Sequence, residues 1–211
     1  MPPTRTPRLT GFAALAGVLA LALAPPAPAQ ETSPLDWAEG AARGVLDLCR
    51  QDAPDAAAVA EHGEVWGWPD FVPYLEHPDG YQREAGGESR RSYTLGDTTA
   101  EVEVTVQSGR VTDAAPANVR YFRCNVAANQ PIEADLEAYF TGLYGAPVSK
   151  TDKGVVWLGG VAAGQSADSD DAALAAVKSA GVGANGLRIE LFHDMDRDQA
   201  KITEYRNVAA D

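Results

Sequence analysis

Basic residues are scarce in this chain of 211 residues. It contains 17 lysines and arginines against 30 aspartates and glutamates, which gives a net charge of −13 at pH 7. Nucleic acids and anionic lipid surfaces attract proteins through concentrated basic patches, and a chain this acidic repels both. We therefore expect neither nucleic acid nor a membrane surface among its partners.

Recognisable catalytic motifs are also missing. The three histidines, His62, His77 and His193, show neither the HxH nor the HxxxH spacing that zinc hydrolases use. No GxSxG segment marks a serine nucleophile, and the glycine-rich segment AGVGANG has no lysine of a phosphate-binding loop. The sequence therefore indicates no established class of enzyme.

Long apolar runs are confined to the N-terminus. Two arginines precede an apolar run that ends at Ala24, and small residues follow at Ala27 and Ala29. This order is typical of a secretory signal peptide, which we expect to span residues 1–29. The run is shorter than the ~20 residues of a spanning helix and two prolines end it, so we expect no membrane anchor. The mature protein is then periplasmic or secreted.

Cysteine is rare as well, with two residues in the chain. Cys49 lies at the edge of an apolar stripe with helical spacing, and Cys124 shares a strand face with Phe122 and Val126. Both cysteines therefore point toward a buried layer. In an exported protein, this pattern predicts a disulfide bond between helix and sheet. The alternative is a catalytic thiol, which needs a reduced cysteine.

Apolar spacing predicts one α+β domain over residues 30–211. Val102, Val104 and Val106 alternate with polar residues, as in a half-buried antiparallel strand. Further elements are expected as strands in VRYFRCNV, GVVWLGGV, LRIELFH and AKITEYRN, as helices after Ser33, over about 54–62 and over about 131–145, and as a loose insertion at 163–186 or a short helix at about 170–178. Because regular βαβ alternation is absent, we expect a two-layer α+β fold. Its mainly antiparallel sheet would be packed on one side by two or three helices.

One segment does not fit a regular element. Residues 64–90 contain several prolines and a pair of glycines, so we expect a long irregular loop. The loop carries several aromatic residues, including Trp66, Trp68 and Tyr74. These side chains either plug one end of the core or form a platform that binds a ligand.

The segment FHDMDRDQAK is the closest match to a metal-binding motif. Asp194, Asp196 and Asp198 occupy the first three ligand positions of a calcium loop, where alternate oxygens converge on the cation. The match then ends, because Gln199 stands where that loop needs glycine and no glutamate follows at the twelfth position. The segment is therefore either a solvated turn between two strands or a weak calcium site. A metal-assisted hydrolase would combine these aspartates with His193.

Four arginines lie at or near the predicted strands: Arg90, Arg91, Arg120 and Arg123. We expect Arg120 and Arg123 to face away from the cysteine side of their strand. If the strands are neighbours, the arginines either form a local basic patch for a carboxylate or phosphate or pair with Glu101 and Glu103 across strands. We favour the cross-strand pairs.

The order of the segments carries a resemblance. A signal peptide, a first helix with a cysteine, a GW segment, a strand with RCNV, a helix and a strand with VVW follow one another. This order is similar to that of small exported proteins of uncharacterised function from alphaproteobacteria. The resemblance covers most of the mature chain and names no activity.

Two functional hypotheses follow from the sequence. The first is an exported, soluble, non-catalytic envelope protein that binds a partner protein or a small ligand. Its binding surface would be the aromatic loop with Trp66, Trp68 and Tyr74 or an exposed sheet face. The second is a metal-assisted hydrolase that uses the aspartate turn at residues 194–198. Apart from weakly bound calcium, the sequence indicates no cofactor.

Overall fold

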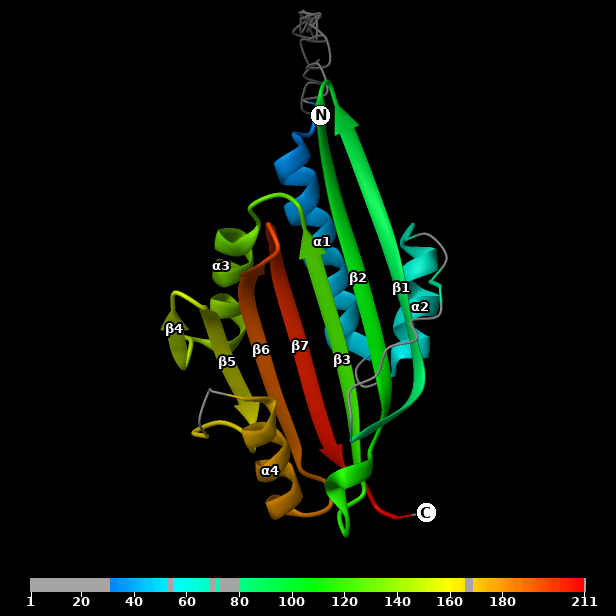
Figure 1. Cartoon of the computed structure of the whole chain (residues 1–211), viewed down its shortest axis with the longest axis vertical. Coiled ribbons are helices and arrows are strands. Elements are labelled where there is room, and N and C mark those ends of the chain that lie inside the picture. The colour runs from blue at the N-terminus through cyan, green and yellow to red at the C-terminus, as the bar shows by residue number, and fades with distance from the viewer. Residues whose placement is uncertain (1–30, 53–54, 69–70, 73–79, 166–168, 211) are drawn as a thin grey trace, which may run out of the picture. The chain divides into compact units, whose positions relative to one another are not determined.

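Antiparallel strands make up most of the structure, a computed structural model that describes residues 31–52, 55–68, 71–72, 80–165 and 169–210. Seven strands form one sheet in the order β1-β2-β3-β7-β6-β5-β4, and neighbouring strands are antiparallel (Figure 1). The strands are β1 (Tyr81–Leu95), β2 (Thr98–Val111), β3 (Val119–Ala128), β4 (Ser149–Thr151), β5 (Gly154–Gly160), β6 (Asn185–Asp194) and β7 (Arg197–Asn207). The helices are α1 (Pro34–Asp52), α2 (Ala56–Val65), α3 (Glu133–Tyr144) and α4 (Asp170–Ala180), with a short 3₁₀ turn at Thr112–Ala114.

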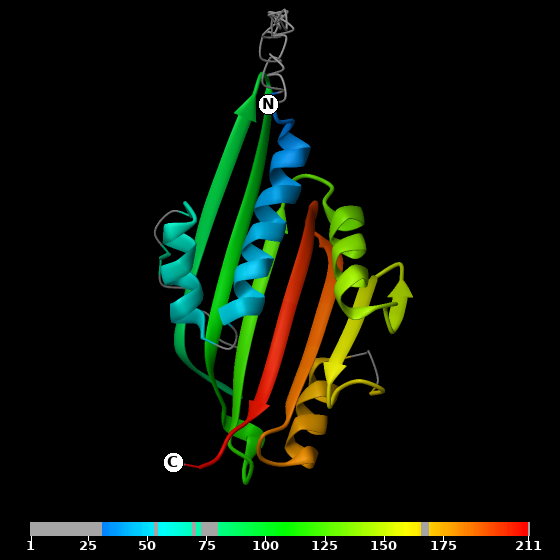
Figure 2. The ribbon, with the colours of Figure 1, turned by 180° about the vertical axis from the view of Figure 1, so that it is seen from behind.

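The sheet has two unlike faces. Helices α1, α2 and α3 pack on one of them, which we call the helical face (Figures 1 and 2). Helix α4 packs on the opposite side, against β6 and β7 at one end of the sheet. The predicted α+β class is confirmed, and α4 adds a helix on the second side of the sheet.

The main apolar core lies between the helical face and helices α1 to α3. Val104 of β2 and Phe122 of β3 are fully buried in it, because alternate side chains of a strand point to the same side. A smaller apolar cluster lies under α4 and includes Tyr121, Tyr205 and Val177. Each side of the sheet therefore has its own apolar support, and that of α4 is the smaller.

The ends of two helices follow local sequence signals. The backbone N–H of Asp36 donates a hydrogen bond to Ser33 Oγ at 3.1 Å, which is the predicted N-terminal cap of α1. Helix α3 ends at Gly145, whose φ of 81° is a conformation that glycine adopts without strain. The Trp157 indole N–H donates to the Gly145 carbonyl oxygen at 3.0 Å and fixes this end of α3 against β5.

The predicted disulfide bond is present. It joins Cys49 of α1 to Cys124 of β3 across 75 positions of sequence, and both cysteines are 0% exposed. The bond therefore links the longest helix to the centre of the sheet. Because both sulfurs are bonded, the alternative of a catalytic thiol is contradicted.

The irregular loop is shorter than predicted, because residues 81–90 belong to β1. Gly86 and Gly87 indicated a break in the strand, but both lie where another backbone comes close. A Cβ atom on Gly86 would be 2.8 Å from the Val106 carbonyl oxygen, and one on Gly87 would be 3.1 Å from that of Val72. A glycine inside a strand often marks such a close approach.

Three further expectations have different outcomes. Helix α2 continues past Gly63 to Val65. Gly63 makes room for the Phe71 ring and does not end the helix, since a Cβ atom there would lie 2.8 Å from a ring carbon. The short helix at about 170–178 is confirmed as α4. The expected signal peptide, residues 1–29, lies outside the described residues.

Candidate binding site on the polar sheet face

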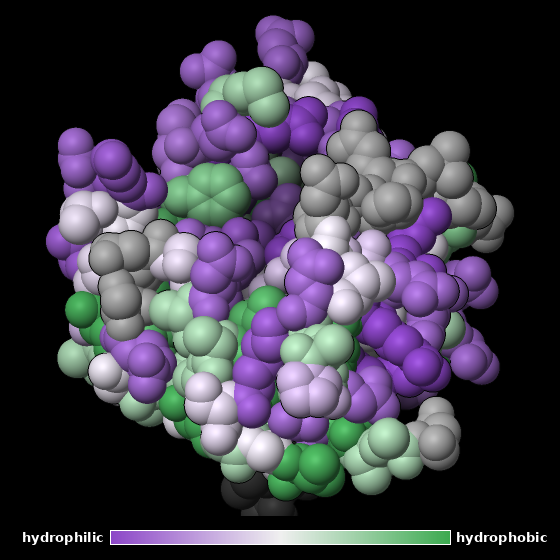
Figure 3. Space-filling model, turned by 60° about the horizontal axis from the view of Figure 1, so that its bottom comes forward, coloured by the Kyte–Doolittle hydropathy of each residue, from purple (hydrophilic) through white to green (hydrophobic). Residues whose placement is uncertain are grey.

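The side of the sheet opposite the helical face carries charged and amide side chains in register, and we call it the polar face. Strand pairing places these side chains opposite one another in transverse rows. The rows are Gln107, Arg123, Thr203, Arg188 and Leu158; then Thr105, Asn125, Lys201, Glu190 and Val156; then Glu103, Ala127, Gln199 and Phe192. Figure 3 shows hydrophilic side chains over much of the surface in its view, with more apolar ones toward the bottom of the picture.

A network of ion pairs lies where α4 begins. The Asp170 carboxylate accepts hydrogen bonds from Arg123 at 3.2 Å and from Arg188 at 3.1 Å. Lys201 donates to Asp170 at 3.4 Å and lies 2.7 Å from Glu190, which Arg188 also contacts. Burial opposes the ionisation of Glu190, but hydrogen bonds from Arg188 and Lys201 outweigh it and lower the pKa of this carboxyl group. The network therefore keeps the Glu190 carboxylate charged.

A second network lies farther along the polar face. Arg197 donates to Glu101 at 3.0 Å and to Glu103 at 3.1 Å, and Arg90 donates to Glu103 at 2.7 Å. The predicted cross-strand pairs are therefore confirmed for Arg90. The expectation for Arg120 was wrong, because it lies two positions from Phe122 and so shares the helical side of β3 with it.

Several polar atoms of this face are shielded from solvent without a hydrogen-bond partner in the described part of the chain. They are Gln107 Oε1, Asn125 Oδ1, Thr203 Oγ1 and Arg123 Nε. All four belong to the first two transverse rows. Buried polar groups are usually satisfied by protein or by ordered water. These atoms can therefore hydrogen-bond to water or to a bound molecule.

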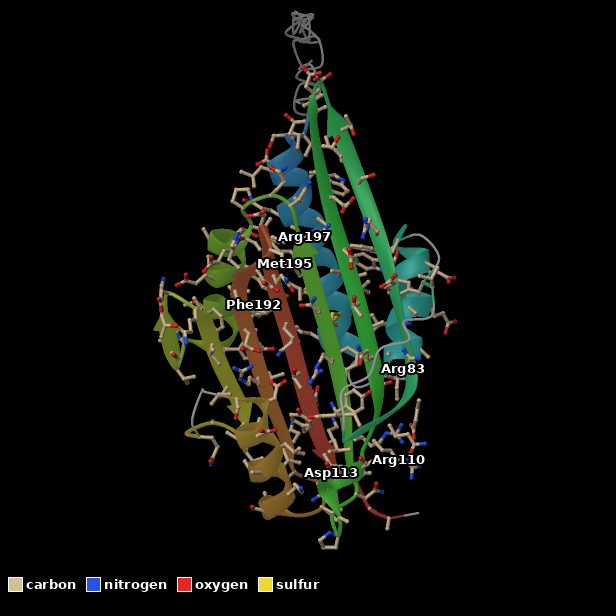
Figure 4. The ribbon with its side chains drawn as sticks, in the orientation of Figure 1. Arg83, Arg110, Asp113, Phe192, Met195 and Arg197 are labelled. Carbon is tan, nitrogen blue, oxygen red and sulfur yellow. A yellow bond between two sulfur atoms is a disulfide. The ribbon has the colours of Figure 1, made fainter. Side chains whose placement is uncertain are left out.

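A groove lies beside β6, where the β4–β5 hairpin meets the polar face. Its volume of about 500 Å³ falls in the range of small-molecule sites. Lys153, Arg188 and Glu190 contribute charge to its lining, and Val156 and Phe192 contribute apolar surface. Figure 4 shows Phe192 on β6, below the hairpin that carries Met195. The groove thus continues the ion-pair network toward the edge of the sheet.

The aspartates of the predicted calcium motif lie at the tip of the β6–β7 hairpin. Asp194 pairs with Arg197, which leaves Met195 and Asp196 as a two-residue turn with φ angles of 49° and 64°. Positive φ at both positions is characteristic of a type I′ turn. Within the described ranges, no group of three or more His, Cys, Asp or Glu side chains could hold a metal ion. The geometry therefore supports the interpretation as a turn. It gives no support to a calcium site formed with Asp198.

The third aspartate, Asp198, connects the hairpin to helix α3. Its Oδ2 accepts a hydrogen bond from the backbone N–H of Glu133 at 2.9 Å, and its Oδ1 lies 2.9 Å from His193 Nδ1. A carboxylate at this position satisfies a free N–H group in the first turn of a helix. The hydrogen bond to Asp198 raises the pKa of His193 above its usual value of 6.5, against a smaller effect of desolvation.

The aromatic residues proposed for binding have different environments. Trp66 is 63% exposed, whereas Trp68 is 4% exposed. The Arg91 guanidinium lies 5.4 Å from the Trp68 ring centroid and 5.7 Å from that of Trp37. Tyr74 lies outside the described residues. Trp68 therefore plugs the core, and Trp66 has the accessibility that a binding platform requires.

Sequence analysis did not single out Asp170, Arg188, Glu190 or Lys201. Arg188 and Glu190 alternate with buried residues of β6 such as Ile189, which is the signal of polar side chains on the side away from the main core. No sequence pattern indicates that this side meets the first turn of α4. That contact depends on how the helix packs on the sheet.

Comparisons with known proteins identify no relative. The chain matches no protein-family model, and no match was found among curated proteins or solved structures. Its function is therefore inferred from its own residues.

Proposed function

We propose that this chain is an exported, non-catalytic protein that binds a partner protein or a small ligand through the polar face. One observation carries the proposal: the two sides of the sheet differ in the side chains that they carry and in the helices that cover them. Three helices bury the apolar side. The other side carries charged rows, buried polar atoms that have no hydrogen-bond partner among the described residues, and a groove of about 500 Å³. A face built in this way suits recognition better than core packing.

Three observations support export to the periplasm or the cell exterior. The disulfide bond joins two buried cysteines, and such bonds persist in oxidising compartments. The first 29 residues have the pattern of a secretory signal peptide. Of the helices that the structure describes, none has both the length and the apolar character needed to cross a bilayer. The resemblance to small exported proteins is in agreement with these features.

The environment of Glu190 supports a binding role over catalysis. Glu190 forms ion pairs with two cations, and its pKa is lowered. A general acid or base that acts near neutral pH needs a carboxyl group with a raised pKa. The Glu190 carboxylate is therefore suited to holding its charge in an ion pair.

The proposal is tested by mapping where small molecules bind. The exported, oxidised protein, labelled with ¹⁵N, is titrated with a library of small polar and aromatic fragments, and amide chemical shifts are recorded. We expect the shifts to concentrate on β5, β6 and β7. Phe192→Ala should reduce binding, whereas Leu143→Ala, which shortens an exposed apolar side chain of α3, should not. Fragments that bind only around α1 to α3 would contradict the proposal.

A further inference from the structure

We propose that the groove between the β4–β5 hairpin and β6 binds a small organic anion, a single carboxylate attached to an apolar or aromatic body. The inference deepens the proposed function and rests on it. It is argued from the size of the groove, from its charges and from the apolar side chains in its lining.

The hairpin edge of the groove is held at a fixed distance from β6. A Cβ atom on Gly154 would lie 2.2 Å from the Leu191 carbonyl oxygen, so only glycine permits this approach of the two backbones. Its φ of 146° is a further reason for glycine. The hydroxyl groups of Ser149 and Thr151 also line the groove. Polar groups in the lining of a groove are suited to fixing the orientation of a ligand.

The charges of the groove leave one cation available. Lys153 lines the groove at the β4–β5 turn, and its ammonium group forms no ion pair with any residue that the structure describes. The other basic residue of the lining, Arg188, is bound to Asp170 and Glu190. That network contains three cations, Arg188, Arg123 and Lys201, and two carboxylates, those of Asp170 and Glu190. The surplus of positive charge favours a negatively charged ligand.

A cationic ligand fits the groove less well. Glu190 is already bound by Arg188 and Lys201, so an ammonium group would have to compete with both. The remaining carboxylate of the lining, Asp152, is exposed at the turn beside the exposed Lys153, and solvent and salt screen both charges. Arg188, in contrast, is 5% exposed, so its charge is screened much less. A ligand with several negative charges would be repelled by a chain whose net charge is −13.

The apolar part of the ligand has a defined place. Phe192 and Val156 line the groove on neighbouring strands and are partly exposed. Neither side chain belongs to the apolar core clusters. A partly exposed ring beside a cation can pack against a flat or aliphatic body. The groove therefore offers a cation for the carboxylate and an apolar wall for the body that carries it.

The test compares three probes that share a benzene ring and differ in charge: benzoate, benzyl alcohol and benzylamine. Each is titrated calorimetrically into the exported, oxidised protein. Benzoate should bind about tenfold more tightly than either of the others. Lys153→Ala should weaken benzoate binding about fivefold, and Phe192→Ala should weaken it as well. Lys150→Ala is the matched control, because this lysine of the same hairpin pairs with Glu137 at 2.6 Å and does not line the groove.

Three results would overturn the inference. Benzylamine could bind as tightly as benzoate, benzoate could fail to saturate below about 10 mM, or Lys153→Ala and Lys150→Ala could have equal effects. The fragment map separates this failure from that of the proposed function. If fragments bound the polar face near Arg90 and Glu103 and caused no chemical-shift changes in the groove, the further inference would fail and the proposed function would still hold. An absence of shifts on the whole polar face would reject both.

Discussion

Two residues of the β6–β7 turn, Met195 and Asp196, hold positive φ angles of 49° and 64°. Such angles are unfavourable for most side chains, and less so for aspartate and asparagine. Met195 is also 83% exposed, so its side chain contributes little packing to offset the strain. We predict that Met195→Asn stabilises the protein by about 1 kcal/mol, measured as a rise of a few degrees in melting temperature.

The turn between β1 and β2 provides a control for this prediction, in which a substitution should have the opposite effect on stability. Gly96 has a φ of 60°, and a Cβ atom added there would meet no atom within 4 Å. Gly96→Ala should therefore lower stability by about 1 kcal/mol through backbone strain alone. If Met195→Asn lowered the melting temperature as Gly96→Ala does, the strain argument would be wrong.

The pair of His193 and Asp198 predicts a dependence of stability on pH. Its hydrogen bond to Asp198 raises the pKa of His193 in the folded protein above the usual 6.5. The folded state therefore holds this proton more tightly than the unfolded chain. The stabilisation is complete below pH 6.5 and is lost as the pH rises through the raised value.

The measurement compares melting temperatures of the wild-type protein and His193→Gln at about pH 5.5 and about pH 8.5. The substitution should lower the melting temperature more at the acidic pH. An equal difference at the two pH values would show that protonation of His193 does not stabilise the fold.

Individual residues were predictable where the signal is local. The Ser33 cap and the inward-facing Cys49 and Cys124 follow from helical and strand spacing, and the structure confirms all three. Arg197 and Glu101 are 96 positions apart in the sequence. Because no local pattern connects such distant positions, their ion pair could not be predicted.

At the level of elements, the ion pairs of Asp170 add to the apolar cluster that supports α4. Asp170 neutralises part of the charge of three cations, and one of them, Arg188, is 5% exposed. Removal of one member of a buried ionic network leaves the remaining charges uncompensated. We predict that Asp170→Asn lowers the free energy of unfolding by about 2 kcal/mol, after a reduction for partial exposure. Urea denaturation measures this change.

The neighbouring residue provides the control for Asp170. Asp171 also lies in the first turn of α4, so both carboxylates interact favourably with the helix dipole. Asp171→Asn should lower stability by less than about 1 kcal/mol. If the two substitutions had the same effect, the ion-pair network would not anchor α4.

The disulfide bond between α1 and β3 should make a large contribution to stability. A bond that closes a loop of 75 positions restricts the unfolded chain by about 4 kcal/mol on the loop-entropy estimate. We predict that the double variant Cys49→Ala, Cys124→Ala loses about this much free energy of unfolding. Because both cysteines are 0% exposed, a mild reductant should leave the bond intact in the folded protein. Rapid reduction without unfolding would contradict this account.

Elements with a clear apolar period were predicted well, and elements defined by packing were not. Strands β2 and β3 and helix α3 appear where their spacing indicated. The start of β1 was missed, because Gly86 and Gly87 have the same appearance in a sequence whether they break a strand or allow another backbone to approach it. The structure shows the second case.

At the scale of the whole molecule, the α+β class follows from antiparallel alternation, and the strand order does not. The order places β7 beside β3, which brings Lys201 and Arg123 onto the same side as Arg188. This order assembles the transverse rows of the polar face. Composition indicated the acidic surface but not that a small surplus of cations lies within it.

The central claim is that the polar face, and not the helical face, is the binding surface. An amide chemical-shift map of the exported, oxidised protein titrated with benzoate tests it most directly. The account predicts the largest shifts at Lys153, at Phe192 and along β5 and β6. Shifts that cluster around the exposed Trp66 and α2 while β5 and β6 remain unchanged would contradict it, because the binding surface would then lie on the helical side of the sheet.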